Sequence, residues 1–134
     1  MLEGVSGTTD DRAGQPVRPV VALEVCLDSC DPGLVAAFWS KLLGYRVEGD
    51  ATARWVHLEP PSGLPVLNLQ RVPEAKAGKN RLHLDPYVER PEDWIAKSEA
   101  LGASRVQLHD DPTDWFQVMA DPEGNEFCIC RESP

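Results

Sequence analysis

Residues 20–44 read VVALEVCLDSCDPGLVAAFWSKLLG, and this stretch decides the fold of the chain. Apolar side chains at alternate positions over residues 21–27 predict a half-buried strand. Asp31 and Pro32 then supply a helix N-cap and a proline for the first helical turn. Apolar residues at helical spacing follow as far as Gly44, a residue type that is common just after a helix. The stretch therefore predicts a strand that leads directly into a helix.

The rest of the chain repeats this pattern with added strands. Strand-like segments follow the first helix at residues 45–48, 53–58 and 65–72. A polar linker over residues 73–79 leads to a second set of elements. These are a strand over 81–87, a helix over 91–101, and strands over 104–108, 115–120 and 126–130.

The spacing of equivalent residues supports an internal duplication. His83 follows Glu24 by 59 residues, and Cys128 follows Asn68 by 60. Offsets this similar in different elements indicate two copies of one unit. We predict an α+β domain over residues 18–134, built from modules at about 20–72 and 79–131. Residues 1–17 are rich in Gly, Ser, Thr, Asp and Pro, and we expect them to form a disordered tail.

Composition excludes several classes of partner. The chain has 134 residues and a net charge of −9, so its surface repels nucleic acid and anionic lipid. It has no apolar run long enough to cross a bilayer and no secretory signal pattern. The four cysteines, Cys26, Cys30, Cys128 and Cys130, form no C-x-x-C zinc pattern. We expect a cytoplasmic protein with free thiols and with neither a nucleic-acid nor a membrane partner.

The two faces of the predicted strands differ in chemistry. Alternate side chains of a strand point to opposite faces, and the apolar set should face the helices. That reasoning sends Phe116 and Val118 toward the helices. The opposite set predicts a ligand cavity, and it contains Glu24, Cys26, Trp55, His57, Asn68, Gln70, Arg81, His83, Asp85, Trp115, Gln117, Met119, Glu126, Cys128 and Cys130. A mixed face turned toward water is the alternative.

Single residues on this face have two interpretations each. His83 is a candidate ligand or general base, or else a hydrogen-bonded histidine of a polar cavity. Glu24 is a candidate proton-transfer group, or else an ionic partner of Arg81 or His83. Trp55 and Trp115 would stack on a planar ligand or line a dimer interface. We expect Asn68, Gln70, Arg81, Asp85 and Gln117 to contact the ligand.

Three motifs resemble one known family. They are Asp31-Pro32 with Phe38-Trp39 and Leu42-Leu43-Gly44, the Asn80–Asp85 strand, and the turn Asp121–Phe127. Together they resemble the vicinal oxygen chelate superfamily, which includes glyoxalase I, bleomycin-resistance proteins and extradiol dioxygenases, and within it the glyoxalase-like domains. The resemblance covers about residues 20–131. It implies two βαβββ modules whose mixed sheets curl into a cup with helices outside, and a homodimer.

The resemblance also implies positions for a divalent metal. Enzymes of the family hold the ion through the first and last strands of each module, and the matching residues are Glu24, Asn68, His83 and Cys128. Only His83 is a usual ligand type in its usual place. Glu24, His83 and Cys128 together would suit zinc. Because two positions depart from the pattern, we favour a site without a metal and keep zinc, nickel or a similar ion as the alternative.

Two functions follow from the resemblance. In the first, the cup acts as a glyoxalase-type lyase or isomerase on a small molecule, with Glu24 and His83 as catalytic residues. In the second, the protein binds and sequesters a small molecule without catalysis, as bleomycin-resistance proteins do. The fold alone does not choose between them.

Overall fold

The computed structural model describes residues 14–132. Most of the predicted disordered tail therefore lies outside the described residues. Residues 14–17 are exposed and belong to no helix or strand.

The first module is a four-stranded mixed sheet with one helix. Its elements are β1 (Glu24–Ser29), α1 (Pro32–Leu43), β2 (Arg46–Glu48), β3 (Trp55–Glu59) and β4 (Val66–Arg71). The strand order is β1-β4-β3-β2, with β1 parallel to β4 and the other pairs antiparallel. Asp31 caps α1 by accepting a hydrogen bond from the backbone N–H of Leu34 at 3.3 Å. Gly44 ends the helix in the left-handed conformation, with φ 73°.

The second module has the same topology. Its elements are β5 (Tyr87–Val88), α2 (Pro91–Ala100), β6 (Ser104–Asp111), β7 (Asp114–Ala120) and β8 (Glu126–Arg131). The order β5-β8-β7-β6 matches the first sheet strand for strand, including the parallel pair at one edge. The predicted α+β fold of two βαβββ modules is thereby confirmed.

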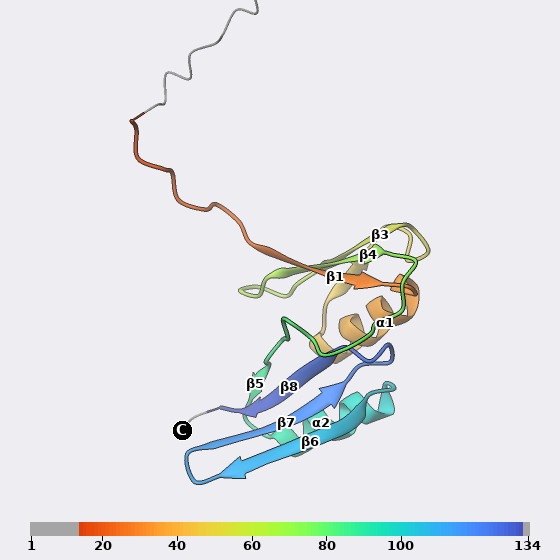
Figure 1. Ribbon diagram of the computed structural model, residues 1–134, viewed down its shortest axis with the longest axis vertical. Coiled ribbons are helices and arrows are strands. Elements are labelled where there is room, and N and C mark those ends of the chain that lie inside the picture. The colour runs from red at the N-terminus through yellow and green to blue at the C-terminus, as the bar shows by residue number, and fades with distance from the viewer. Residues whose placement is uncertain (1–13, 133–134) are drawn as a thin grey trace, which may run out of the picture.

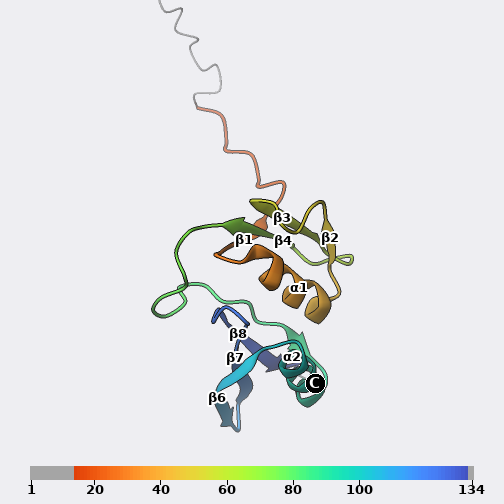
Figure 2. The same cartoon turned by 90° about the vertical axis from the view of Figure 1, so that its right-hand side faces the viewer.

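Helix α1 lies between the two sheets, as Figures 1 and 2 both show. One side of it covers the first sheet, where Val56, Leu58 and Leu67 are at most 1% exposed. Its other side meets the second module, where the ring centroids of Trp39 and Phe127 lie 4.9 Å apart with the ring planes inclined at 69°. The two modules therefore share one hydrophobic core through α1.

The predicted strand over residues 81–87 is wrong in its extent. Only Tyr87–Val88 forms a strand, preceded by a single bridge from Leu84 to Phe127. Pro86 lacks an N–H, so it cannot donate to a continuous ladder. The segment still follows β8, since Leu84 and Pro86 accept hydrogen bonds from the backbone N–H groups of Cys128 and Cys130. This keeps residues 83–87 extended beside β8.

No helix within residues 14–132 is long and apolar enough to span a membrane.

Candidate functional site

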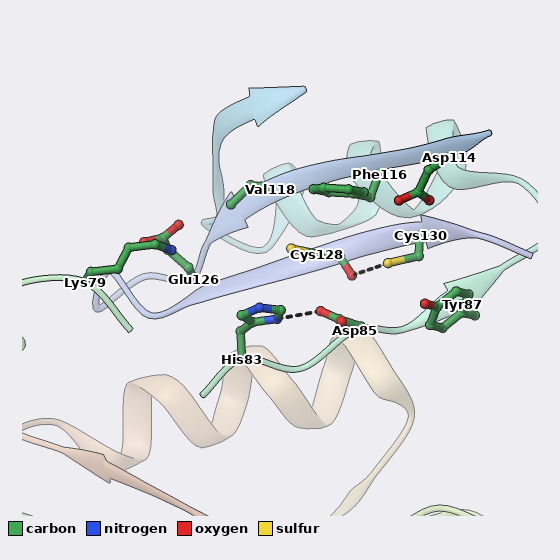
Figure 3. A pocket seen from close by; sticks show the side chains of 10 residues that line it. All are labelled: Lys79, His83, Asp85, Tyr87, Asp114, Phe116, Val118, Glu126, Cys128 and Cys130. Atoms are coloured by element: carbon green, nitrogen blue, oxygen red, sulfur yellow. Dashed lines mark hydrogen bonds and ion pairs between the residues drawn. The ribbon is translucent and has the colours of Figure 1, made fainter. Parts of the chain in front are cut away.

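A cavity of about 400 Å³ lies on the open face of the second sheet. Its walls come from β5, β7, β8 and the extended segment before β5, as Figure 3 shows. Its volume falls within the range of about 300–1,000 Å³ typical of small-molecule sites. The lining residues are Lys79, His83, Asp85, Tyr87, Asp114, Phe116, Val118, Glu126, Cys128 and Cys130. The cavity thus combines an apolar floor with charged groups at its rim.

His83 and Asp85 form a pair at this cavity. His83 Nδ1 lies 2.6 Å from Asp85 Oδ1, and the two side chains are 45% and 37% exposed. Residues two apart in an extended segment point the same way, which brings the carboxylate to the ring. A carboxylate on Nδ1 fixes the ring orientation and leaves Nε2 for another partner. This pair is the arrangement in the cavity best suited to moving a proton.

A sequence signal for such pairs exists and was missed in the prediction. Each of the three histidines is followed two residues later by an acidic residue. In the structure, His57 pairs with Glu59 at 2.8 Å and His109 with Asp111 at 2.7 Å. His57 and His109, which the sequence analysis did not single out as chemical groups, therefore have carboxylate partners of the same kind.

The two thiols of β8 face this cavity but are poor nucleophiles. Burial, together with the nearby charge of Asp85, raises the pKa of Cys128 to about 11. The same two causes raise the pKa of Cys130 to about 11. Both side chains are therefore protonated at neutral pH and act as small, polarisable lining groups.

The predicted face of β7 is wrong. Phe116 lies opposite Cys130 and Val118 opposite Cys128, so all four share the cavity face. Gln117 is 4% exposed and lies opposite the buried Ile129, on the helix side of the sheet. Large apolar residues occupy both faces of β7, so alternation alone does not show which face is turned toward the helices. The pairing of β7 with β8 shows it.

The face of Trp115 is corrected with that of Gln117. It lies on the helix side of β7, where the guanidinium of Arg131 stacks over its ring at 4.7 Å. Met119 lies on the same side and is completely buried. None of the three lines the cavity. Arg81 is exposed and does not line it either.

The first sheet carries its predicted polar face on the side opposite α1. Cys26, Asn68 and His57 lie side by side across β1, β4 and β3. Asn68 is buried, and its Oδ1 lies 3.1 Å from His57 Nδ1. The hydrogen bond to Glu59 raises the pKa of His57, and the contact with Asn68 adds to it. Asn68 is thus engaged with a neighbouring side chain on its own sheet.

Trp55 and Gln70 share that face with Glu24. Trp55 is 50% exposed and lies opposite Gln70 in the β3–β4 pair. Glu24 begins β1 and is exposed. Because α1 separates this sheet from the second module, the open faces that carry Glu24 and His83 do not meet within one chain.

Two side-chain groups in residues 14–132 bring three potential metal ligands within 4.8 Å of one another. The first contains His83, Asp85 and Cys128, so Asp85 stands where the sequence analysis expected Glu24. The second contains Glu48, His57 and Glu59. In that group Arg46 already pairs with Glu48 at 2.7 Å.

Comparisons with known proteins agree with this architecture. The family model for the glyoxalase-like domain matches residues 24–130. The chain therefore belongs to the glyoxalase-like domain family. No curated protein matches the chain in sequence.

Several solved structures are similar to this chain in fold. Lactoylglutathione lyase from Agrobacterium tumefaciens has a TM-score of 0.61 and 20% identity, with 85% of this chain and 96% of that protein covered. The bleomycin-binding protein of Streptomyces verticillus, complexed with copper(II)-bleomycin, has a TM-score of 0.60 and 14% identity, with 87% of this chain and 100% of that protein covered. The fosfomycin resistance protein FosX of Listeria monocytogenes has a TM-score of 0.69 and 9% identity, with 87% of this chain and 96% of that protein covered. At identities this low, the similarity shows the fold alone. The activity has to be inferred from the residues of the site.

Proposed function

We propose that the protein binds a small molecule in the cavity of the second module, and that His83, oriented by Asp85, transfers a proton in a lyase or isomerase reaction on it. The observation that carries this proposal is the 2.6 Å contact between His83 Nδ1 and Asp85 Oδ1 at the cavity. Phe116, Val118 and the protonated thiol of Cys128 would hold the apolar part of the ligand. His83 Nε2 would then exchange a proton with a carbon next to a carbonyl.

The donor set also fits a divalent metal. One imidazole, one carboxylate and one thiol with donor atoms within 4.8 Å suit zinc better than magnesium or calcium. His83, Asp85 and Cys128 would hold the ion, and it would supply Lewis-acid polarisation of a ligand oxygen. Cys128 would bind as the thiolate, because a coordinating thiol loses its proton. Metal analysis of protein purified without an affinity metal column tests this part.

A homodimer would complete the predicted site. Glu24, Trp55 and Gln70 lie on the open face of the first sheet, and α1 lies between this sheet and the second module (Figure 1). We propose that a second copy brings this face over the cavity, where Glu24 would act as a second proton-transfer group. Asn68 would line the same face.

The four free cysteines agree with the expected reducing, cytoplasmic location.

Proton exchange tests the catalytic proposal. Small α-hydroxy ketones and α-keto acids are incubated with the protein in D2O, and loss of the proton next to the carbonyl is followed by NMR. The wild type should accelerate exchange for at least one compound, and H83Q should abolish the acceleration. C130S is the matched control, since it changes a cavity residue without touching the histidine pair. Exchange at the buffer rate for every compound would contradict the proposal.

Sequestration without chemistry is the second candidate function. It is favoured by the protonated thiols and the apolar floor, which bind a ligand without reacting with it. The similar protein from Streptomyces verticillus binds bleomycin. Equilibrium dialysis against bleomycin tests this candidate. Saturable retention of the unchanged compound, lost in V118W, supports it, whereas retention that V118W leaves unaffected contradicts binding in this cavity.

A further inference from the structure

A second cavity, of about 550 Å³, lies in the first module. It is lined by Cys30, Thr52, Arg54, Arg71, Val72 and Pro73. These residues come from the C-terminal ends of β1 and β4 and from the turn before β3. The cavity is thus separate from the one that carries the proposed function.

Arg54 and Arg71 are opposite each other on neighbouring chain segments that line this cavity. The backbone N–H of Arg71 donates to the carbonyl oxygen of Arg54 at 2.8 Å, which continues the antiparallel pairing of β3 with β4 by one position. Directly opposite residues share a face, so the two guanidinium groups are cross-strand neighbours. Arg71 Nη1 donates to the carbonyl oxygen of Cys30 at 3.3 Å, which leaves its other N–H groups available. Like charges in this arrangement repel each other unless an anion lies between them.

Neither arginine forms a salt bridge with any residue in the range 14–132. By contrast, Arg46, Arg90, Arg105 and Arg131 each have a carboxylate partner. The chain has 22 acidic residues against 13 basic ones, so carboxylates are in excess. Arg18 and Arg81 also have no carboxylate partner within residues 14–132, so what distinguishes Arg54 and Arg71 is that they are cross-strand neighbours beside one cavity.

Two carboxylates that contact lining residues or their neighbours, Glu123 and Asp50, accept hydrogen bonds from other groups. Glu123 accepts hydrogen bonds from Ser29 Oγ and, at 2.7 Å, from the backbone N–H of Cys30. Burial raises the pKa of Glu123, but these hydrogen bonds outweigh it and the net pKa is lowered. Asp50 accepts from both the backbone N–H and the hydroxyl of Thr52, at 2.8 and 2.7 Å. Neither carboxylate forms a salt bridge with Arg54 or Arg71 among the described residues.

We propose that this cavity binds a small oxyanion, a phosphate or a carboxylate, between Arg54 and Arg71. The planar guanidinium fork matches the oxygen spacing of both groups and donates to them in a bidentate manner. The anion would also remove the repulsion between the two cationic side chains. This site goes beyond the proposed function, because it shares no lining residue with the cavity at His83.

Calorimetric titration with inorganic phosphate, and separately with acetate, tests the site at constant ionic strength. The wild type is compared with R54Q and R71Q. R90Q is the matched control, since it removes one positive charge from an exposed arginine that pairs with Asp93 at 3.0 Å on α2. Circular dichroism checks that each variant is folded. The deuterium exchange of the carbonyl compounds described above is measured with the same variants, so that failure of the anion site and failure of the His83 site can be told apart.

The proposal expects saturable binding of at least one anion that weakens about tenfold in R54Q and in R71Q, as expected for loss of a charge-assisted pair of hydrogen bonds. R90Q should bind as the wild type does, and the anion that binds more tightly identifies the class of ligand. Equal weakening in R90Q would mean a general charge effect and would overturn the proposal. Failure of both anions to bind the wild type would overturn it as well, whatever the outcome at His83.

Discussion

The indole nitrogen of Trp39 donates a buried hydrogen bond of 3.0 Å to Asp121 Oδ2. Trp39 belongs to α1 of the first module, and Asp121 begins the turn before β8 of the second. The other oxygen of Asp121 accepts from the backbone N–H groups of Glu123 and Asn125, at 2.9 Å each. One carboxylate therefore shapes the turn and joins the modules. This relationship explains how the strand with Cys128 is fixed relative to α1.

Replacing Asp121 should destabilise the whole domain. We expect D121A to lower the free energy of unfolding by about 2–4 kcal/mol, since several buried donors would lose their partner. D121N keeps the shape and part of the hydrogen bonding, so its loss should be about half as large. Urea unfolding followed by circular dichroism measures both. Equal stability of D121A and wild type would show that the turn is held by other contacts.

The thiols of β8 should resist alkylation at neutral pH. Burial and the charge of Asp85 raise the pKa of Cys128 and Cys130 to about 11 each, so the reactive thiolate is scarce. Iodoacetamide labelling followed by peptide mass spectrometry should find little modification of either thiol near pH 7. The labelling rate of Cys128 and Cys130 should rise steadily toward pH 11. Rapid labelling of Cys128 near pH 7 would instead mean a thiolate and contradict this description of the cavity.

The His57–Glu59 pair should make stability depend on pH. The hydrogen bond to Glu59 raises the folded-state pKa of His57 above its ordinary value of 6.5. The stabilisation is therefore fully present below 6.5 and is lost as the pH rises through the raised pKa. The stability difference between wild type and H57Q should be larger at about pH 5.5 than at about pH 8.5. E59Q should reproduce the effect, and a difference independent of pH would refute it.

The proposed dimer predicts a specific effect of Trp55. This side chain is 50% exposed on the open face of the first sheet. W55E should weaken dimerisation by about tenfold or more, because a buried tryptophan is a frequent binding hot spot. L34E is the matched control, since Leu34 is 48% exposed on α1, on the other side of the sheet. Sedimentation equilibrium measures both, and a wild type that is monomeric at all concentrations would exclude the dimer.

Local patterns in the sequence predicted the elements well. The strand before Asp31 and the helix that ends at Gly44 follow from periodicity and capping, which depend on neighbouring residues alone. The internal repeat predicted two copies of one unit, and both sheets have the same strand order. The strand over residues 81–87 failed for an equally local reason, since Pro86 interrupts its ladder.

The site was less predictable because it depends on how elements pack. Strand alternation gave the correct face for His83 and Cys128, but it gave the wrong one for Gln117, where both faces of β7 carry large apolar residues. Alternation also says nothing about how two sheets are oriented. The family resemblance assigned Glu24 and His83 to one site, whereas within one chain α1 lies between their sheets (Figures 1 and 2). The His83–Asp85 pair could have been predicted, because each histidine is followed two residues later by an acidic residue.

Mapping of amide chemical shifts tests the central claim most directly. The ¹⁵N-labelled protein is titrated with small α-hydroxy ketones and α-keto acids, and the shifts are followed by two-dimensional NMR. The account predicts that a binding compound moves the amides of Leu84, Val118 and Cys128 and that H83Q reduces the effect. Shifts confined to the first sheet, around Cys26 and Asn68, would contradict a ligand site in the second module.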